Sequence, residues 1–221
     1  MAYDFDKIAR DYDRMNRLMT LSLDRCWRKR AVKGLHGNVL DVACGTGDMA
    51  LALQDADCTV TGVDLSEEML AIAEQKAPAA TYMIADAERL PFPDETFDAV
   101  TCAFGVRNFV HLERGLNEML RVLKPCGSMV ILELATPDCA IIKPFYNLYA
   151  KHIIPFLGQM LAGNREAYTY LPESIARFPK GDDFLRILNK SNYKVLLDHQ
   201  KLTFGVCRLY TVQKTEKQRG C

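Results

Sequence analysis

The sequence predicts an α/β domain built around one doubly wound, mostly parallel sheet of seven strands. Between residues 38 and 134, short apolar runs that end in turn residues alternate with amphipathic stretches, which is the pattern of buried parallel strands joined by helices. Strict alternation implies right-handed crossovers with helices on both faces of the sheet. With 221 residues, of which 49% are hydrophobic and 25% charged, the chain has the size and composition of one globular domain.

The predicted strands follow in order along the chain. Five apolar runs predict parallel strands, at 38–44, 58–65, 81–86, 97–104 and 128–134. Ser66, followed by Glu67 and Glu68, favours a helix start after the second strand through capping and the helix dipole. The segment 124–127, Lys-Pro-Cys-Gly, predicts a turn before the fifth strand. Two β-rich runs at 193–200 and 206–213 predict a terminal antiparallel hairpin.

Helical segments flank this core on both sides. Residues 1–37 carry apolar side chains at helical spacing and predict an N-terminal helical cover. Residues 140–190 predict several helices, with Pro144, Pro155 and Pro172 as punctuation. One domain therefore divides into four parts, which are an N-terminal cover (1–37), an α/β core (38–139), a helical substrate cover (140–190) and a hairpin with a frayed tail (191–221).

Charge is distributed unevenly, although 28 basic and 28 acidic side chains give a net charge of zero. Residues 1–37 carry a net charge of +4, residues 38–139 carry −11 and residues 140–221 carry +7. The neutral total excludes a nucleic-acid binder of the bulk basic kind. Basic, aromatic-rich flanks fit reversible contact with an anionic membrane surface.

Cysteine usage and the opening residues predict a reduced, cytoplasmic protein without a metal site. None of the eight cysteines forms a C-x-x-C pair, and residues 1–14 are too polar for a secretory signal. No apolar run reaches the length of a membrane span, because charged residues and prolines interrupt 140–163. This segment can nevertheless lie against a membrane, which allows a peripheral position at its inner face.

A glycine-containing loop, residues 41–48, joins the first strand to its helix. Gly45 and Gly47 allow a tight turn and the close approach of a ligand to the backbone, and a helix N-terminus follows. With Ala50, and with Asp64 nineteen residues after Gly45, the loop also meets the dinucleotide-binding pattern. A nicotinamide-dependent oxidoreductase is therefore a competing hypothesis, and glycines that serve packing alone are a third.

Three acids at strand ends favour a different cofactor. Asp41, Asp64 and Asp86 end the first three strands, where ligands bind in open α/β sheets. Asp41 would repel a pyrophosphate but receive an ammonium group, Asp64 can accept from ribose hydroxyls, and Asp86 can accept from the adenine amine. S-adenosylmethionine carries all three groups and a sulfonium charge, so it is the cofactor we predict.

Several motifs resemble, in order, the class I methyltransferases of ubiquinone and menaquinone biosynthesis. They are LDVACGTGD, VTGVDLSEEML, DAERLPFPDETFDAV, AFGVRNF and LRVLKPCG. RDYDRMNRLMTLSLDRCWRKRAV and YTYLPESIARFP resemble the N-terminal segment and a late helical motif of that family. The resemblance thus covers nearly the whole chain. The first two motifs occur in many methyltransferases, whereas AFGVRNF together with YLPESI is specific to the quinone C-methyltransferases.

The resemblance implies the cofactor-binding residues. Family contacts match Thr46, Asp64, Asp86 and Ala87, and a further one matches Ala103, where some members have serine. Any contact by Ala103 must therefore use its backbone or packing. Cys126 stands where the family usually has glycine, which puts the geometry of that turn in doubt.

The implied reaction is methylation of a ring carbon of a polyprenylated hydroquinol, with demethylmenaquinol as the first candidate and the ubiquinone precursor as an open second one. Carbon becomes nucleophilic when the neighbouring hydroxyl loses its proton, so the site needs proton removal and a stabiliser for the phenolate. We predict that Arg107 stabilises the phenolate and polarises a water, because arginine stays protonated. Asn108 is predicted to position the ring hydroxyl, and Tyr12 to close over the site.

Three other functions stay open at this point. The first is an O- or N-methyltransferase for another small molecule, which the motifs AFGVRNF and YLPESI disfavour. The second is the nicotinamide-dependent oxidoreductase, and the third is a non-catalytic cofactor-binding or membrane-associated subunit. A homodimer is also left open. His111, His152 and His199 lack an acid or cysteine partner at suggestive spacing, and with Cys44 and Trp27 they are expected to be structural or solvated.

An apolar, aromatic-rich segment is predicted to cover the prenyl tail of the substrate. Its large apolar side chains are Phe145, Tyr146, Tyr149, Ile153, Ile154, Phe156, Leu157, Met160 and Leu161.

Overall fold

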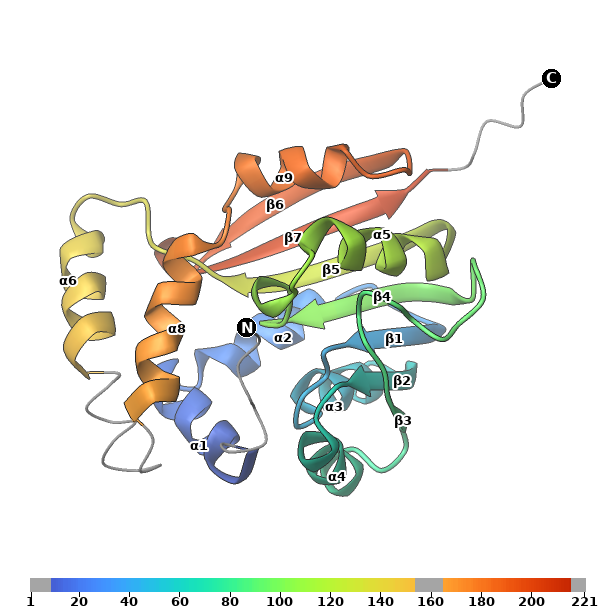
Figure 1. Ribbon diagram of the computed structural model, residues 1–221, viewed down its shortest axis with the longest axis horizontal. Coiled ribbons are helices and arrows are strands. Elements are labelled where there is room, and N and C mark those ends of the chain that lie inside the picture. The colour runs from blue at the N-terminus through green and yellow to red at the C-terminus, as the bar shows by residue number, and fades with distance from the viewer. Residues whose placement is uncertain (1–8, 154–164, 216–221) are drawn as a thin grey trace.

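A computed structural model describes residues 9–153 and 165–215 of the chain (Figure 1). Seven strands form one sheet in the order β3-β2-β1-β4-β5-β7-β6. The first five strands pair in parallel and the last two are antiparallel, which confirms the predicted doubly wound sheet and its terminal hairpin. Within the described ranges no helix has both the length and the apolar character needed to cross a bilayer.

Each predicted strand has a counterpart in the sheet. The strands are β1 (Asn38–Val42), β2 (Thr59–Asp64), β3 (Thr81–Ile84), β4 (Phe97–Ala103), β5 (Leu123–Leu134), β6 (Val195–Leu202) and β7 (Cys207–Lys214). In β1 every residue after Asn38 is buried, as a parallel strand covered on both faces requires. Register places Asp41 of β1 beside Gly62 and Thr101, so the carboxyl ends of β1, β2 and β4 lie together at one edge.

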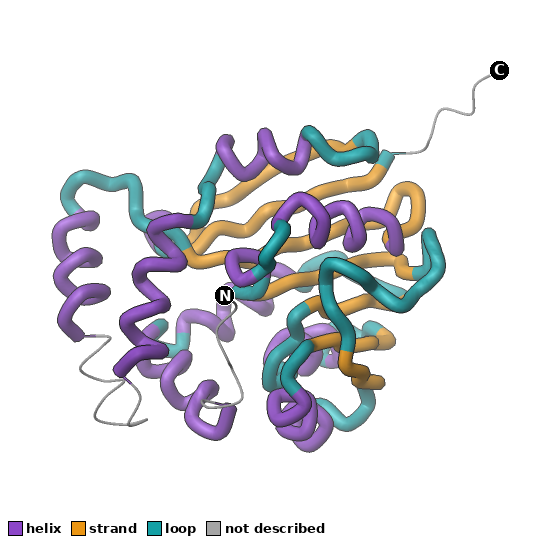
Figure 2. Tube along the Cα trace, in the orientation of Figure 1, coloured by secondary structure: helices purple, strands orange, loops and turns teal. Residues whose placement is uncertain are grey.

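Helices cover both faces of the sheet (Figure 2). On one face, α5 (Leu112–Val122) and α9 (Asp182–Asn189) pack into a cluster centred on Leu120 and Phe184. On the other face, α2 (Leu23–Ala31) and α3 (Asp48–Gln54) contribute Trp27 and Met49 to a second cluster.

The helix α4 (Glu67–Lys76) follows β2. As predicted, it begins at Ser66, whose hydroxyl accepts the N–H of Met69 at 3.1 Å.

The remaining helices gather at the carboxyl edge of the parallel strands (Figure 1). They are α1 (Ala9–Met19), α6 (Ile142–Leu148), which continues into the π-helical turn η3 (Tyr149–Ile153), and α8 (Arg165–Arg177). Two prolines predicted to punctuate these helices lie inside them instead. Pro144 falls in the first turn of α6, where a missing N–H is tolerated, and Pro172 lies within α8. Pro155 lies outside the described residues.

The predicted turn at 124–127 is an irregularity inside β5 rather than a separate element. The strand begins at Leu123, and its pairing with β4 jumps from Leu123 to Ser128. Cys126 adopts the left-handed conformation, with φ of 62°. That conformation favours glycine, so the family's usual residue would relieve strain here.

The terminal hairpin turns through a short 3₁₀ segment, η4 (Thr203–Gly205). All three of its residues have positive φ. Trp27 of α2 donates its indole N–H to Thr203 Oγ1 at 2.9 Å, which ties the N-terminal cover to this turn.

Candidate functional site

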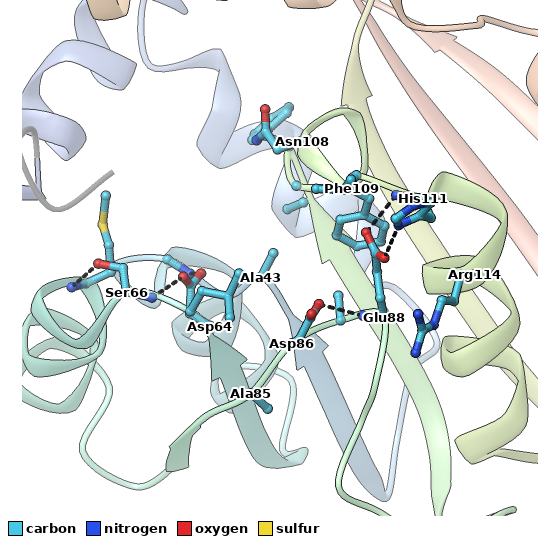
Figure 3. Close-up of a pocket in the computed structure, with 18 of the residues that line it drawn as sticks. Ala43, Asp64, Ser66, Ala85, Asp86, Glu88, Asn108, Phe109, His111 and Arg114 are labelled. Carbon is cyan, nitrogen blue, oxygen red and sulfur yellow. Dashed lines mark hydrogen bonds and ion pairs between the residues drawn. The ribbon is translucent and has the colours of Figure 1, made fainter. Parts of the chain in front are cut away.

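A cavity of about 600 Å³ opens at the carboxyl edge of the sheet (Figure 3). Its lining comes from the ends of β2 and β4, the loops after β1 and β3, the segment between β4 and α5, and from α1. Of the predicted site residues, the lining includes Tyr12, Gly45, Asp64, Asp86, Ala87, Ala103 and Asn108. The segments that the sequence analysis selected separately therefore meet around one cavity.

Asp64 holds the glycine loop to the end of β2. Its carboxylate accepts the N–H of Gly45 at 2.8 Å and the N–H of Ser66 at 3.0 Å. Gly45 has φ of 53°, and no atom lies within 4 Å of the place where a Cβ would stand. The glycine thus leaves space above the loop, and Asp64 lines that space with fixed orientation.

Asp86 and Ala87 form the opposite lip of the cavity. Asp86 is exposed and accepts the N–H of Glu88 at 2.9 Å, which fixes the loop after β3. Ala87 is buried at the edge of the core cluster. An exposed carboxylate beside a small apolar residue provides an acceptor next to a flat contact surface.

The end of β4 supplies the third wall. Ala103 and Phe104 line the cavity, and Phe104 has φ of 61°. The 3₁₀ turn η2 (Val106–Asn108) then places Asn108 at the cavity (Figure 3). Gly105 allows this turn to approach the glycine loop, because a Cβ there would meet Ala43 Cβ at 2.7 Å.

Asp41 lies beneath the cavity rather than in its lining. Its side chain is fully buried, and one carboxylate oxygen accepts the hydroxyl of Thr101 at 2.8 Å. Among the described residues, the other oxygen has no hydrogen-bond partner. Burial raises the pKa of Asp41 to about 7, against the opposing effects of Thr101 and Arg28. A buried carboxylate with an unsatisfied oxygen is suited to a cationic partner.

Thr46 and Gly47 of the predicted cofactor set turn away from the cavity. The Thr46 hydroxyl donates to Asp13 of α1 at 2.5 Å and accepts from Lys76 of α4 at 3.1 Å. A Cβ at Gly47 would lie 2.9 Å from Ala73 Cβ, so this glycine allows α3 to pack against α4. The packing role that the sequence left open thus applies to Gly47.

A network of ion pairs joins the N-terminal cover to the glycine loop, and sequence reasoning missed it. Asp48, the first residue of α3, accepts from Arg17 at 2.9 Å and from Lys76 at 2.9 Å. These partners lower the pKa of Asp48 to about 2, although burial alone would raise it. Asp24 bridges Arg17 and Arg28 at 2.5 Å and 2.6 Å.

The side chain of Arg107, a residue of η2, is held by buried partners. Its guanidinium pairs with Glu133 of β5 at 2.6 Å and donates to the Phe104 carbonyl. The Arg107 and Glu133 side chains are 5% and 1% exposed. Arg107 is not among the described residues that line the cavity. Its predicted contact with a phenolate stays a prediction, and the structure adds an anionic partner that the sequence did not indicate.

Tyr12 reaches the cavity from α1. Burial raises the pKa of its hydroxyl, while Arg107 and a side-chain hydrogen bond with Asn16 act in the opposite direction. The hydroxyl is therefore protonated at neutral pH and is able to donate a hydrogen bond.

His111, for which the sequence showed no acid partner at suggestive spacing, has an acid partner from a distant segment. Its Nδ1 lies 2.8 Å from Glu88 Oε2, and its backbone N–H donates to Glu88 Oε1 at 2.7 Å (Figure 3). Burial alone would raise the pKa of Glu88, but these hydrogen bonds lower it. The pair joins the loop after β3 to the segment between β4 and α5 across 23 residues of sequence, a separation that no local motif reveals.

The other residues set aside by the sequence analysis have structural or solvated positions. Trp27 and Cys44 are buried, and burial raises the pKa of the Cys44 thiol well above its usual value. His199 stacks on Tyr210 and His152 is exposed. The seven cysteines in the described part of the chain are free thiols, and no cluster suited to a metal is found there.

Known proteins that are similar to this chain identify its fold and its family. The fold matches a SAM-dependent methyltransferase of Thermotoga maritima with a TM-score of 0.69, at 19% identity, over 96% of this chain and 98% of that one. At that identity the match shows the fold alone.

Sequence relatives are much nearer. The ubiquinone/menaquinone biosynthesis C-methyltransferase UbiE of Geotalea daltonii is 40% identical over 95% of this chain and 94% of its own length. The demethylmenaquinone methyltransferase of Bacteroides fragilis is 39% identical over 95% of this chain and 90% of its own length. The sequence profile of the ubiE/COQ5 methyltransferase family matches residues 2–214. The chain therefore belongs to the ubiE/COQ5 methyltransferase family.

Proposed function

We propose that this methyltransferase transfers the methyl group of S-adenosylmethionine to a ring carbon of a polyprenylated hydroquinol, with demethylmenaquinol as its first substrate. The observation that carries the proposal is the set of strand-end acids around one cavity in a chain of this family. Asp64 and Asp86 line the cavity, and Asp41 lies buried beneath it. Relatives at about 40% identity named for quinone C-methylation supply the substrate class.

The residues present fit this cofactor. Asp64 is oriented to accept from ribose hydroxyls, and Asp86 with Ala87 offers an acceptor and a contact surface for adenine. The unsatisfied oxygen of buried Asp41 fits an ammonium group. When bound, S-adenosylmethionine supplies an electrophilic methyl group on a sulfonium centre. Thr46, which points to Asp13, would act on the cofactor only indirectly, by holding the loop.

The substrate side requires groups that favour a phenolate. Asn108 lines the cavity and can donate its amide N–H to a ring oxygen. Tyr12, protonated at neutral pH, can donate a second hydrogen bond. Arg107 contributes positive charge behind this wall, reduced by its pairing with Glu133. We therefore assign Asn108 and Tyr12 to direct contact with the ring oxygen and Arg107 to electrostatic support.

Family membership decides against the nicotinamide-dependent oxidoreductase, and the C-methyltransferase named among the relatives favours carbon over oxygen or nitrogen as acceptor. A cytoplasmic location, a homodimer and the lack of a nucleic-acid partner remain predictions from the sequence.

The direct test uses purified protein, methyl-deuterated S-adenosylmethionine and chemically reduced demethylmenaquinone. We expect one labelled methyl group on the ring carbon, identified by fragmentation in mass spectrometry. Asn108→Ala should lower kcat while leaving the Kd for the cofactor near the wild-type value. A label on oxygen, or no transfer by a protein that binds the cofactor, would contradict the proposal.

A further inference from the structure

One side of α6 carries large apolar side chains that no described part of the protein covers. Ile141, directly before α6, and Phe145 and Leu148 within it recur at helical spacing and are 77%, 71% and 59% exposed. None of the residues of α6 is buried, and the helix stands at the edge of the molecule beside α8 (Figure 1). Single exposed apolar residues are normal on a protein surface, but a stripe of three on one helix indicates an interaction site.

The adjacent side of the same helical segment packs against α1, the helix that carries Tyr12. A small apolar cluster joins this segment to α1. It contains Tyr146, Tyr149 and Ala150 together with Met15 and Tyr12. Burial raises the pKa of Tyr146 to about 12, with Arg107 acting in the opposite direction. A single segment thus connects the exposed stripe with residues that surround Tyr12 and Arg107.

Further exposed leucines lie at the turn between α1 and α2, which η3 contacts. The hydroxyl of Tyr149 donates to the Met19 carbonyl at 3.1 Å, which brings η3 against the end of α1. Leu21, two residues further on, is 77% exposed and has positive φ. Leu18 and Leu23 on either side of it are also exposed.

The exposed charges in the segments that carry these side chains are mostly positive. The nearby exposed acids are paired, Asp138 with Lys180, Lys201 and Arg208, and Glu173 of α8 with Arg177. Among the side chains described in 9–31 and 139–153, every exposed charged one is a cation, and they are Arg14, Arg25, Lys29, Arg30 and Lys143. The acids described there, Asp13 and Asp24, are paired with Lys76 and with Arg17 and Arg28. Apolar side chains on segments that also carry an excess of exposed positive charge are complementary to an anionic lipid bilayer.

We propose that this face, which we call the docking face (Leu18, Leu21, Leu23, Ile141, Phe145 and Leu148), binds the surface of an anionic lipid bilayer. The inference rests on the proposed function, because a polyprenylated hydroquinol resides in such a bilayer. Docking brings the segment that surrounds Tyr12 to the surface from which the quinol ring must enter. The apolar segment of the predicted tail cover beyond Ile153 lies outside the described residues.

The test compares two charge insertions of the same kind. Ile141→Glu with Leu148→Glu places two acids on the docking face, whereas Leu196→Glu places one at an exposed leucine of β6, far along the sequence from this face. Vesicles of phosphatidylglycerol with phosphatidylcholine, and vesicles of phosphatidylcholine alone, are sedimented with each protein. We expect wild type and Leu196→Glu to bind the anionic vesicles and to be released by salt, and the double variant to bind at least tenfold less.

Methyl transfer to a short-chain, water-soluble hydroquinol separates the two proposals. The double variant should keep the wild-type rate with this acceptor and lose rate only with polyprenylated quinol presented in vesicles. If wild type ignores anionic vesicles, or if the double variant binds them equally well, the docking face is refuted. A wild-type dimer that the double variant converts to monomer, without vesicle binding, would make a second copy the occupant and also refute it. Failure of wild type with the soluble acceptor would instead count against the proposed reaction.

Discussion

The α/β core and the helices that cover its carboxyl edge are held together by different forces. In the core, Val39, Leu40 and Val100 are completely buried, and the sheet is packed from both faces. In the cover, α6 buries no residue, and α1 combines two buried side chains, Ala9 and Met15, with charged links to the glycine loop. The difference separates a predicted cofactor site at the packed edge of the sheet from a predicted substrate side that depends more on polar links.

The polar links converge on the glycine loop, the element predicted to bind the cofactor. Asp48 at the start of α3 and Thr46 in the loop are the points where α1 is attached, through Arg17 and Asp13. A shift of the loop on cofactor binding would therefore be transmitted to Tyr12, the neighbour of Asp13. Each of the following substitutions perturbs either the core or the cover, but not both.

The largest effect is expected at the buried pair of the core. Arg107→Met leaves Glu133 charged at 1% exposure, and breaking a buried pair costs about 3–5 kcal/mol of unfolding free energy. Arg177→Met removes a partner of Glu173 from an exposed helix pair and should change stability by less than about 0.5 kcal/mol. Urea denaturation of both variants measures the contrast. Equal losses would show that Arg107 is not part of the stable core.

The second effect concerns cofactor affinity. Asp64→Ala removes the carboxylate that orients the glycine loop and faces the cavity, and we expect a loss of about 1–3 kcal/mol in binding free energy. Titration calorimetry with S-adenosylmethionine measures the loss, and Asp57→Ala in the turn before β2 serves as the control. Wild-type affinity for Asp64→Ala would refute the placement of the cofactor.

The third effect is a pH dependence that arises from Asp41. Because burial raises its pKa from 3.8 to about 7, the folded protein binds this proton more tightly than the unfolded chain. The free energy of unfolding should therefore fall as pH rises from about 4 towards 7 and level off above it.

Cofactor binding should show the opposite trend. The ammonium group of the cofactor favours the ionised form of Asp41. Below pH 7, affinity for the cofactor should therefore increase by up to about tenfold for each unit that the pH rises, and binding should release a proton. Calorimetry in buffers of different ionisation enthalpy detects that proton. Asp41→Asn should flatten the profile, and a profile unchanged in this variant would assign the titration to another group.

The smallest effect on stability is expected in the cover. Asp13→Ala removes the carboxylate that accepts from Thr46 and Lys76. The partly exposed ion pair of Asp13 with Lys76 contributes about 1 kcal/mol or less to the free energy of unfolding. Hydrogen exchange should nevertheless become faster in α1 while β1 and β4 stay protected. Equal protection of α1 in wild type and variant would show that apolar packing at Met15 is sufficient to hold it.

Sequence patterns predicted the core well because its elements follow local rules. All seven strands, the Ser66 cap and the row of acids at strand ends are encoded by periodicity and by turn residues close in sequence. The contacts that were missed join distant segments, as Arg107 joins Glu133 and Glu88 joins His111. No spacing rule connects such partners, because only the sheet topology brings them together. Thr46 illustrates the limit, since its position in the loop was predicted but the direction of its side chain depends on α1.

The most direct test of the central claim is the quinone content of cells that lack this protein. The lipid extract should contain demethylmenaquinone in place of menaquinone, and expression of the wild-type chain should restore the ring methyl group. Asn108→Ala, produced at the same level, should leave most of the quinone unmethylated. Unchanged menaquinone in the deficient cells, or full restoration by Asn108→Ala, would contradict a site in which this wall of the cavity acts on the quinol ring.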